Sequence, residues 1–184
     1  MEKIPVDISG LFIPHPMQLF IFGTYKEDSK VNLGLFCWLN FCWDDELSVM
    51  ACLDGNKLTK DRIKETGIFS ANLVTESMLP LVDYLGHRKG YDGKEVSELT
   101  GLMPGTVLNV PVLKESPLSY ELEVKKTVPL NGSDIFICSI RNTLAANTIL
   151  VDINHYDLKR SVPVVVSLNR YFGLAEKENL GGWK

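Results

Sequence analysis

Hydrophobic residues recur mostly at every second position along the chain, which is the spacing of β-strands. Turn residues or charged residues bound most of these alternating stretches. The pattern predicts strands over residues 17–25, 31–43, 47–53, 68–74, 120–125, 135–140 and 162–168. The long stretch 31–43 is expected to be one strand that bends at Gly34.

The stretch 120–125 shows the alternation most plainly, because three apolar residues alternate with Glu121, Glu123 and Lys125. This pattern predicts a strand with one buried face and one face in water. The dipeptide Asn131-Gly132 follows, and it is a signal for a tight hairpin turn into the strand 135–140.

Three short helical stretches interrupt the strands. Thr59 to Thr66 is charged and is followed by Gly67 as a C-terminal cap, and Ser77 to Leu85 has apolar residues at the i, i+3, i+4, i+7 spacing. Lys94 to Thr100 predicts a third helix. The helices do not alternate one for one with strands. We therefore expect a mainly β fold, an antiparallel barrel with inserted helices, rather than a doubly wound parallel sheet.

Composition narrows the class of protein. With 184 residues, of which 45% are hydrophobic, the chain is expected to be a single domain over residues 1–184. Its 19 basic and 23 acidic residues argue against nucleic acid as a partner. The longest apolar stretch falls short of the roughly 18 residues of a membrane helix, and the first residues have no apolar signal core. We expect a cytoplasmic protein with no membrane partner.

The four cysteines, Cys37, Cys42, Cys52 and Cys138, all lie in apolar, strand-like contexts. They form no Cys-x-x-Cys pattern, so no metal site is predicted. We interpret them as small buried residues in a reducing compartment, with a redox-active Cys37–Cys42 pair as the alternative.

The familiar local signatures of catalysis and nucleotide binding are missing from the sequence. It contains no Gly-x-Gly-x-x-Gly, no P-loop, no His-Glu-x-x-His and no Gly-x-Ser-x-Gly. The three histidines, His15, His87 and His155, are far apart. No catalytic side chain is predicted.

Two segments have the composition of an anion site. Residues 54–59 join a strand to a helix, and Lys57 and Thr59 add a charge and a hydroxyl to the unpaired N–H groups of the helix start. Alternatively, Asn56 or Thr59 caps the helix and Lys57 is simply solvated. Residues 86–94 combine three glycines with basic residues, and the alternative there is a flexible loop. Each segment supports the other, because a nucleotide-like cofactor needs such clusters.

An ordered set of motifs over roughly residues 12–175 resembles the flavin reductase-like, FMN-binding split-barrel family, and within it the flavoredoxin type. Asn32 and Trp38 stand at the family's spacing, Lys57-x-Thr59 matches its basic-x-Thr, and a strand ends in Asn72-Leu73. The set continues with Asp83-x-x-Gly86, with Gly90 and Lys94, and with Tyr171-Phe172-Gly173. The chain departs from the family at Asp44-Asp45-Glu46, Lys89 and Gly93.

The resemblance implies an antiparallel split barrel of six or seven strands that binds FMN without a covalent bond. It implies a homodimer with the flavin near the subunit interface. The phosphate would be held by Lys57 and Thr59 with help from the glycine loop. The residues implied in flavin binding are Asn32, Cys37, Trp38, Leu39, Asn40, Lys57, Thr59, Asn72, Leu73, Arg88, Lys89, Gly90 and Lys94.

These features favour an FMN oxidoreductase or an electron-transfer flavoprotein, that is, a NAD(P)H:flavin reductase or a flavoredoxin. The electron donor would be a nicotinamide dinucleotide or a protein. One alternative is a non-catalytic FMN- or haem-binding relative that acts as a sensor or carrier. Another is an interaction module whose barrel has lost its ligand.

Overall fold

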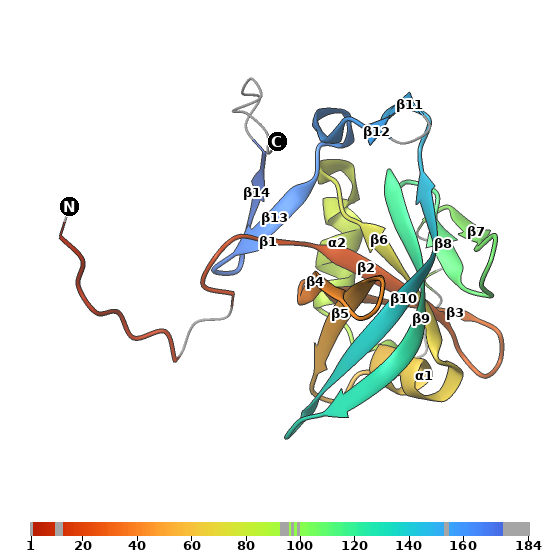
Figure 1. Cartoon of the computed structure of the whole chain (residues 1–184), viewed down its shortest axis with the longest axis horizontal. Helices are drawn as coiled ribbons and strands as arrows, with labels where there is room; N and C mark the ends of the chain where they lie inside the picture. The colour runs from red at the N-terminus through yellow and green to blue at the C-terminus, as the bar shows by residue number, and fades with distance from the viewer. Residues whose placement is uncertain are drawn as a thin grey trace.

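The computed structural model describes residues 2–9, 13–92, 96, 98, 100–152 and 155–174. An antiparallel sheet of seven strands, in the order β3-β2-β6-β9-β10-β5-β4, dominates the fold (Figure 1). Its strands are β2 (Phe20–Tyr25), β3 (Val31–Phe36), β4 (Leu39–Trp43), β5 (Leu47–Asp54), β6 (Ile68–Leu73), β9 (Leu118–Pro129) and β10 (Ser133–Ala145). The mainly β, antiparallel class predicted from the sequence is confirmed.

The sheet curls because its two edge strands are neighbours in the chain. β3 and β4 lie at opposite ends of the strand order, yet only Cys37 and Trp38 separate them. Each residue of extended chain spans roughly 3.5 Å, so the two edges must lie close together. The result is a barrel that is split between β3 and β4.

The prediction of one strand over residues 31–43 is therefore wrong. Phe36 pairs with Phe20 in β2, whereas Leu39 pairs with Ala51 in β5, so the two halves belong to opposite edges of the sheet. The chain breaks at Cys37 and Trp38, and Gly34 continues the register of β3 opposite Phe22.

Short strands outside the barrel form three small sheets, and the sequence pattern predicted only part of them. The predicted strand 162–168 is realised as β13, and the predicted strand 17–25 divides into β1 and β2 because β1 pairs with β13 instead of continuing the barrel. The first small sheet contains β1 (Met17–Gln18), β13 (Val164–Ser167) and β14 (Arg170–Gly173). The second pairs β7 (Leu102–Pro104) with β8 (Pro111–Leu113), and the third pairs β11 (Leu150–Asp152) with β12 (His155–Tyr156).

Two α-helices, α1 (Leu58–Thr66) and α2 (Leu79–Gly86), are inserted as predicted. Gly67 adopts a left-handed φ of 72° and its N–H donates to the carbonyl of Ile63 at 2.9 Å, which confirms it as the cap of α1. Most of the predicted third helix, 94–100, lies outside the described residues. Three 3-10 turns complete the set: η1 (Glu76–Met78), η2 (Gly90–Asp92) and η3 (Leu158–Ser161).

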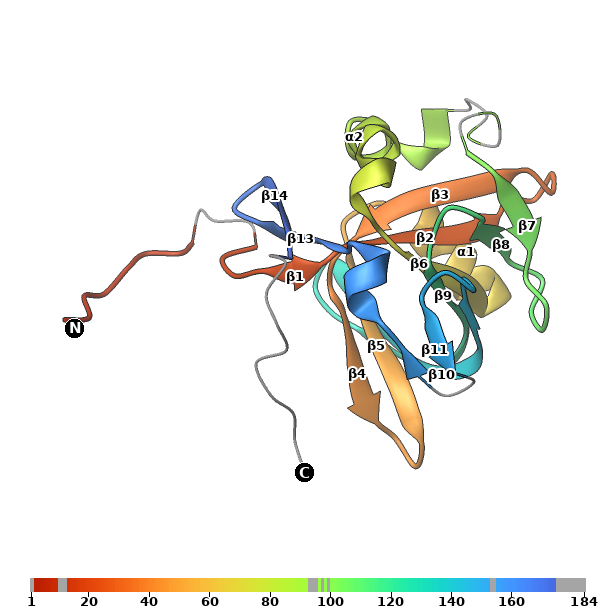
Figure 2. The same ribbon diagram turned by 90° about the horizontal axis from the view of Figure 1, so that it is seen from above.

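The two faces of the sheet support two apolar clusters. Phe20 and Phe22 point into the barrel, where Ile63 of α1 joins them, while Leu19 and Ile21 belong to the cluster that includes the buried residues of α2. Figure 2 shows α2 lying over β2 and β3, outside the barrel. No helix in the described part of the chain is long and apolar enough to cross a membrane.

Glu121 departs from the wet face predicted for its strand. Its carboxylate is fully buried and accepts hydrogen bonds from the backbone N–H groups of Thr106 at 2.9 Å, Val107 at 3.0 Å and Leu108 at 2.6 Å. The loop between β7 and β8 therefore covers this part of β9. Burial alone would raise the pKa of the Glu121 carboxyl, but these hydrogen bonds outweigh it and lower the pKa overall.

Candidate functional site

A pocket of about 660 Å³ opens where β3 and β4 separate, and its volume is in the usual range for sites that bind small molecules. Four parts of the chain line it: the end of β3 with Cys37 and Trp38, the segment 54–59 that enters α1, the loop after α2, and the hairpin of β13 and β14. The pocket is thus built where the barrel splits, and its walls come from both halves of the sequence.

One end of the pocket is cationic. Lys57, Arg88 and Lys89 line it together with Thr59 and Gly90. The two segments predicted as anion sites, 32 positions apart at Lys57 and Lys89, are therefore brought together in the fold.

Lys57 is the residue from which α1 begins. Its backbone is extended, with φ −132° and ψ 126°, and no side chain caps the helix. The alternative in which Asn56 or Thr59 caps α1 is therefore wrong. The first N–H groups of a helix have no partner within the helix, so a ligand at this end meets N–H donors as well as the Lys57 ammonium.

Thr59 is held in place from behind by Asn32. The Asn32 Nδ2 donates to Thr59 Oγ1 at 2.9 Å and to Thr24 Oγ1 at 3.0 Å, and Asn32 itself does not line the pocket. Because the Thr59 oxygen accepts this bond, its own hydrogen is left to donate. A Cβ on Gly34 would lie 2.5 Å from Thr59 Oγ1, so only glycine lets α1 start so close to β3.

The loop after α2 carries the other two cations. The Arg88 guanidinium donates to the hydroxyl of Tyr84 at 2.9 Å, and its central carbon lies 5.2 Å from the centre of the Tyr84 ring. His87 contacts the carbonyl of Asp83 through Nδ1 at 2.7 Å. These contacts fix the first part of the loop to the last turn of α2.

The other end of the pocket is largely apolar. Cys37, Trp38, Ile13, Leu19 and Val166 line it. Burial raises the pKa of the Cys37 thiol to about 11, so this side chain carries no charge at neutral pH. The four thiols are all free, with Cys37 and Cys138 buried as predicted, whereas Cys42 and Cys52 are only half-buried.

Five residues implied by the family resemblance do not line this pocket: Asn32, which supports Thr59 from behind, and Leu39, Asn40, Asn72 and Leu73. The Asn72 amide is buried and fully engaged, donating to the Ile21 carbonyl at 2.9 Å and accepting from the Leu113 N–H at 3.0 Å. Leu39 and Leu73 point into the barrel, and Asn40 is exposed on the edge strand β4. Lys94 lies outside the described residues.

Residues of the C-terminal hairpin were not predicted for the pocket. Asn169 and Tyr171 line it, and the Tyr171 hydroxyl donates to an Asp83 carboxylate oxygen at 3.0 Å. Leu168 and Asn169 both have positive φ, 48° and 60°, as two-residue hairpin turns require. A Leu-Asn pair lacks the glycine that marks such turns, so the motif at Tyr171 was the one sequence signal for this hairpin.

Metal-binding clusters and histidines contribute little to this arrangement in the described ranges. No group of three His, Cys, Asp or Glu residues there is placed to hold a metal ion. His87 is the single described histidine that lines the pocket. The lining therefore offers cations, amides, hydroxyls and apolar walls, together with the carboxylates of Asp54 and Asp83. The cations, the amides and the apolar walls suit an anionic ligand with a large flat apolar part.

The family model of the flavin reductase like domain matches residues 14–157. The chain belongs to this family. Among curated proteins, none matches the sequence. The residues that line the pocket lie within the matched range, except for Ile13 and those of the hairpin of β13 and β14.

Solved structures share the fold over nearly the whole chain. Flavoredoxin from Methanosarcina acetivorans is 23% identical with a TM-score of 0.86, covering 97% of this chain and 95% of its own. An FMN-binding protein from Thermus thermophilus, with bound p-hydroxybenzaldehyde, is 17% identical with a TM-score of 0.79, covering 98% and 99%. A protein described as a flavin reductase with a split barrel domain, from Shewanella frigidimarina, is 22% identical with a TM-score of 0.76, covering 91% and 87%. These likenesses establish the split-barrel fold.

Proposed function

We propose that this protein binds FMN without a covalent bond and acts as an oxidoreductase or electron-transfer protein through it. The observation that carries the proposal is the polarity of the pocket. Its cationic end combines Lys57, Thr59 and the start of α1 with Arg88 and Lys89, and its other end is lined by Cys37 and Trp38. Membership of the flavin reductase-like family supports a flavin as the ligand.

The residues of the cationic end fit a phosphate monoester. A phosphate carries close to two negative charges, which two or three cations and the N–H groups of a helix start can balance. Hydrogen bonds from charged donors are the strong ones, and Lys57 has no ion-pair partner in the described part of the chain. We expect Lys57 and Thr59 to orient the phosphate and Arg88 with Lys89 to close over it.

The residues of the apolar end fit a flavin ring. Cys37 is neutral and Trp38 is half-buried, so a flat ring there displaces water without meeting an unpaired charge. When bound, FMN supplies the capacity to accept and pass on a hydride or single electrons. The chain's own part is to hold the ring, exclude water from it and set the electrostatic surroundings of its reacting edge.

FMN is favoured over FAD for three reasons. The sequence lacks a motif for a pyrophosphate, and a structural neighbour from Thermus thermophilus is named as an FMN-binding protein. The pocket's two cationic segments meet at one end, as a single terminal phosphate requires.

A second copy of this chain is the partner that we propose. Phe41, Trp43 and Leu47 at the open edge of the barrel are 52%, 77% and 54% exposed, which is unusual for large apolar side chains that lie together. They sit on β4 and β5, next to the pocket residues Cys37 and Trp38. A dimer formed over this edge would cover them and bring a second chain close to the flavin.

Anaerobic reduction tests the proposed function. Protein loaded with FMN is mixed with NADH or NADPH in a stopped-flow instrument, and loss of the flavin absorbance near its visible maximum is followed. Reduction of the bound flavin by either nucleotide supports an enzyme. Reduction by dithionite alone supports a carrier that takes electrons from a protein, and failure to bind any flavin overturns the proposal.

His87→Ala tests whether a side-chain acid or base is needed. Hydride transfer requires alignment of donor and acceptor, and His87 is held by the carbonyl of Asp83 at the rim. With FMN saturating, we expect the variant to be reduced at a rate within a few-fold of the wild type. His155→Ala, which lies outside the pocket, is the matched control.

A further inference from the structure

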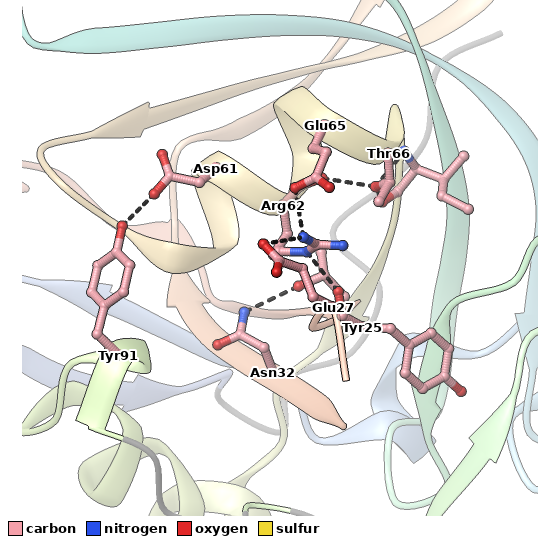
Figure 3. Close-up of polar contacts among 10 residues, drawn as sticks. Tyr25, Glu27, Asn32, Asp61, Arg62, Glu65, Thr66 and Tyr91 are labelled. Carbon is pink, nitrogen blue, oxygen red and sulfur yellow. Dashed lines mark hydrogen bonds and ion pairs between the residues drawn. The ribbon is translucent and has the colours of Figure 1, made fainter. Parts of the chain in front are cut away.

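Tyr91 ties the cationic loop to helix α1. Its hydroxyl donates to a carboxylate oxygen of Asp61 (Figure 3). The same hydroxyl lies 2.8 Å from Oδ1 of Asn56. Asp61 stands in the first turn of α1 and Asn56 in the segment that enters it. Tyr91 thus bridges the two segments that form the cationic end of the pocket, although its own side chain does not line that pocket.

A second contact between the loop and the start of α1 is made at Gly90. A Cβ at this position would lie 2.8 Å from Oδ1 of Asn32 and 3.0 Å from Cβ of Leu58, so the loop backbone packs directly on the start of α1. Asn32 in turn donates to Thr59. Gly90 therefore packs on Asn32, the residue that positions Thr59. The next residue, Tyr91, holds the loop to α1 through its hydrogen bond to Asp61.

The hydrogen bond from Tyr91 to Asp61 restrains Arg88 and Lys89, because these two residues lie between the end of α2 and Tyr91. Arg88 is fixed to α2 through Tyr84, and Tyr91 fixes the far side of the loop to α1. A loop held at both ends has already lost conformational freedom, so a phosphate that binds there does not have to order it.

We propose that Tyr91 is a positioning residue of the anion site: it holds the loop 86–92 closed on α1 and thereby raises affinity for the phosphate of FMN. This inference rests on the proposed function. The hydrogen bond to Asp61 raises the pKa of the Tyr91 hydroxyl to about 12, so the hydroxyl keeps its proton and remains a donor over the neutral range.

Replacing Asp61 should change the affinity for FMN in a direction that depends on its role. As a carboxylate beside a phosphate site it should repel the ligand, and simple electrostatics predicts that its removal tightens binding. If its main role is to hold Tyr91, removal loosens the loop and weakens binding instead. The direction of the change in affinity therefore separates the two roles.

The test is flavin affinity, measured by fluorescence quenching with FMN and with riboflavin, which lacks the phosphate. For Tyr91→Phe we expect FMN to bind about 5- to 20-fold more weakly, mostly through faster release, while riboflavin changes less than about twofold. Tyr25→Phe is the matched control. It makes the same substitution in a residue outside the pocket and should leave both affinities unchanged.

Asp61→Ala should also weaken FMN binding. The double variant should bind FMN no more weakly than the more affected single variant, because both substitutions remove the same hydrogen bond between Tyr91 and Asp61. Tighter FMN binding by Asp61→Ala, or an unchanged FMN affinity for Tyr91→Phe, overturns the positioning role while the proposed function stands. Equal losses for FMN and riboflavin also overturn it. Failure of the wild-type protein to bind FMN overturns the proposed function itself.

Discussion

Lys57 brings a full charge to the point where α1 starts, and this single residue joins the local backbone to the chemistry of the pocket. The extended backbone at Lys57 ends the strand-to-helix segment, and its side chain lines the cationic end with Arg88 and Lys89. The ammonium and the helix N–H groups would act on the same bound anion, because both lie at the same end of the pocket.

Replacing Lys57 by Ala should therefore weaken FMN far more than riboflavin. Loss of one charge-assisted hydrogen bond costs roughly 1.5–3 kcal/mol, which is about 10- to 150-fold in affinity. Isothermal titration with each flavin measures both. Lys64→Ala, near the other end of the same helix and ion-paired with Asp134, is the control and should bind both flavins like the wild type. Equal losses for the two flavins would mean that Lys57 does not meet the phosphate.

Side-chain type predicted some pocket residues well and others poorly. Lys57, Arg88 and Lys89 were predicted because a cation beside a helix start or in a glycine-rich loop has the composition of an anion site, and all three line the pocket. Asn72 was assigned to the flavin by resemblance, but its amide is consumed by backbone groups of two other segments. Such long-range hydrogen bonds leave no trace in the local sequence.

At the scale of elements, the period of two predicted an antiparallel barrel, but neither its seventh strand nor its closure. The alternation cannot distinguish one long strand from two that belong to opposite edges, because both show the same pattern over residues 31–43. The pairing of Phe36 with β2 and of Leu39 with β5 decides it. The site depends on that break, since Cys37 and Trp38 line the pocket there.

Glu121 ties an element of the barrel to the loop between β7 and β8, and its charge should stabilise the fold. Glu121→Gln removes the charge and presents an amide to backbone N–H donors, so we expect the free energy of unfolding to fall by about 1.5–3 kcal/mol. Urea denaturation measures this change. Glu123→Gln, exposed on the same strand, is the control and should change stability by less than about 0.5 kcal/mol.

The pH dependence of this effect has a definite sign. The folded-state pKa of Glu121 lies below its ordinary value, so its contribution is present at neutral pH and is lost as the pH falls through that range into the acid. The difference between wild type and Glu121→Gln should therefore shrink below about pH 4.5. A difference that stays constant down to pH 3 would contradict a buried, ionised carboxylate.

The whole molecule has one pocket with a cationic end and an apolar end, and an exposed apolar edge that follows Cys37 and Trp38 at the apolar end. We expect a homodimer that covers Phe41, Trp43 and Leu47. Light scattering at micromolar concentration should give about twice the 20.6 kDa of one chain. Trp43→Lys should shift the mass toward one chain, whereas Val107→Lys, an exposed apolar residue of the loop between β7 and β8, should not. A wild-type mass near that of one chain would contradict the dimer.

We propose above all that the pocket at the split of the barrel binds a flavin through its terminal phosphate. The most direct measurement is an equilibrium titration of flavin-free protein with FMN, riboflavin and FAD under the same conditions, followed by identification of the flavin that heat releases from protein purified from cells. The account predicts that FMN binds at least about tenfold more tightly than riboflavin or FAD and is the flavin released. FAD as the only flavin released, or equal affinities for FMN and riboflavin, would contradict it.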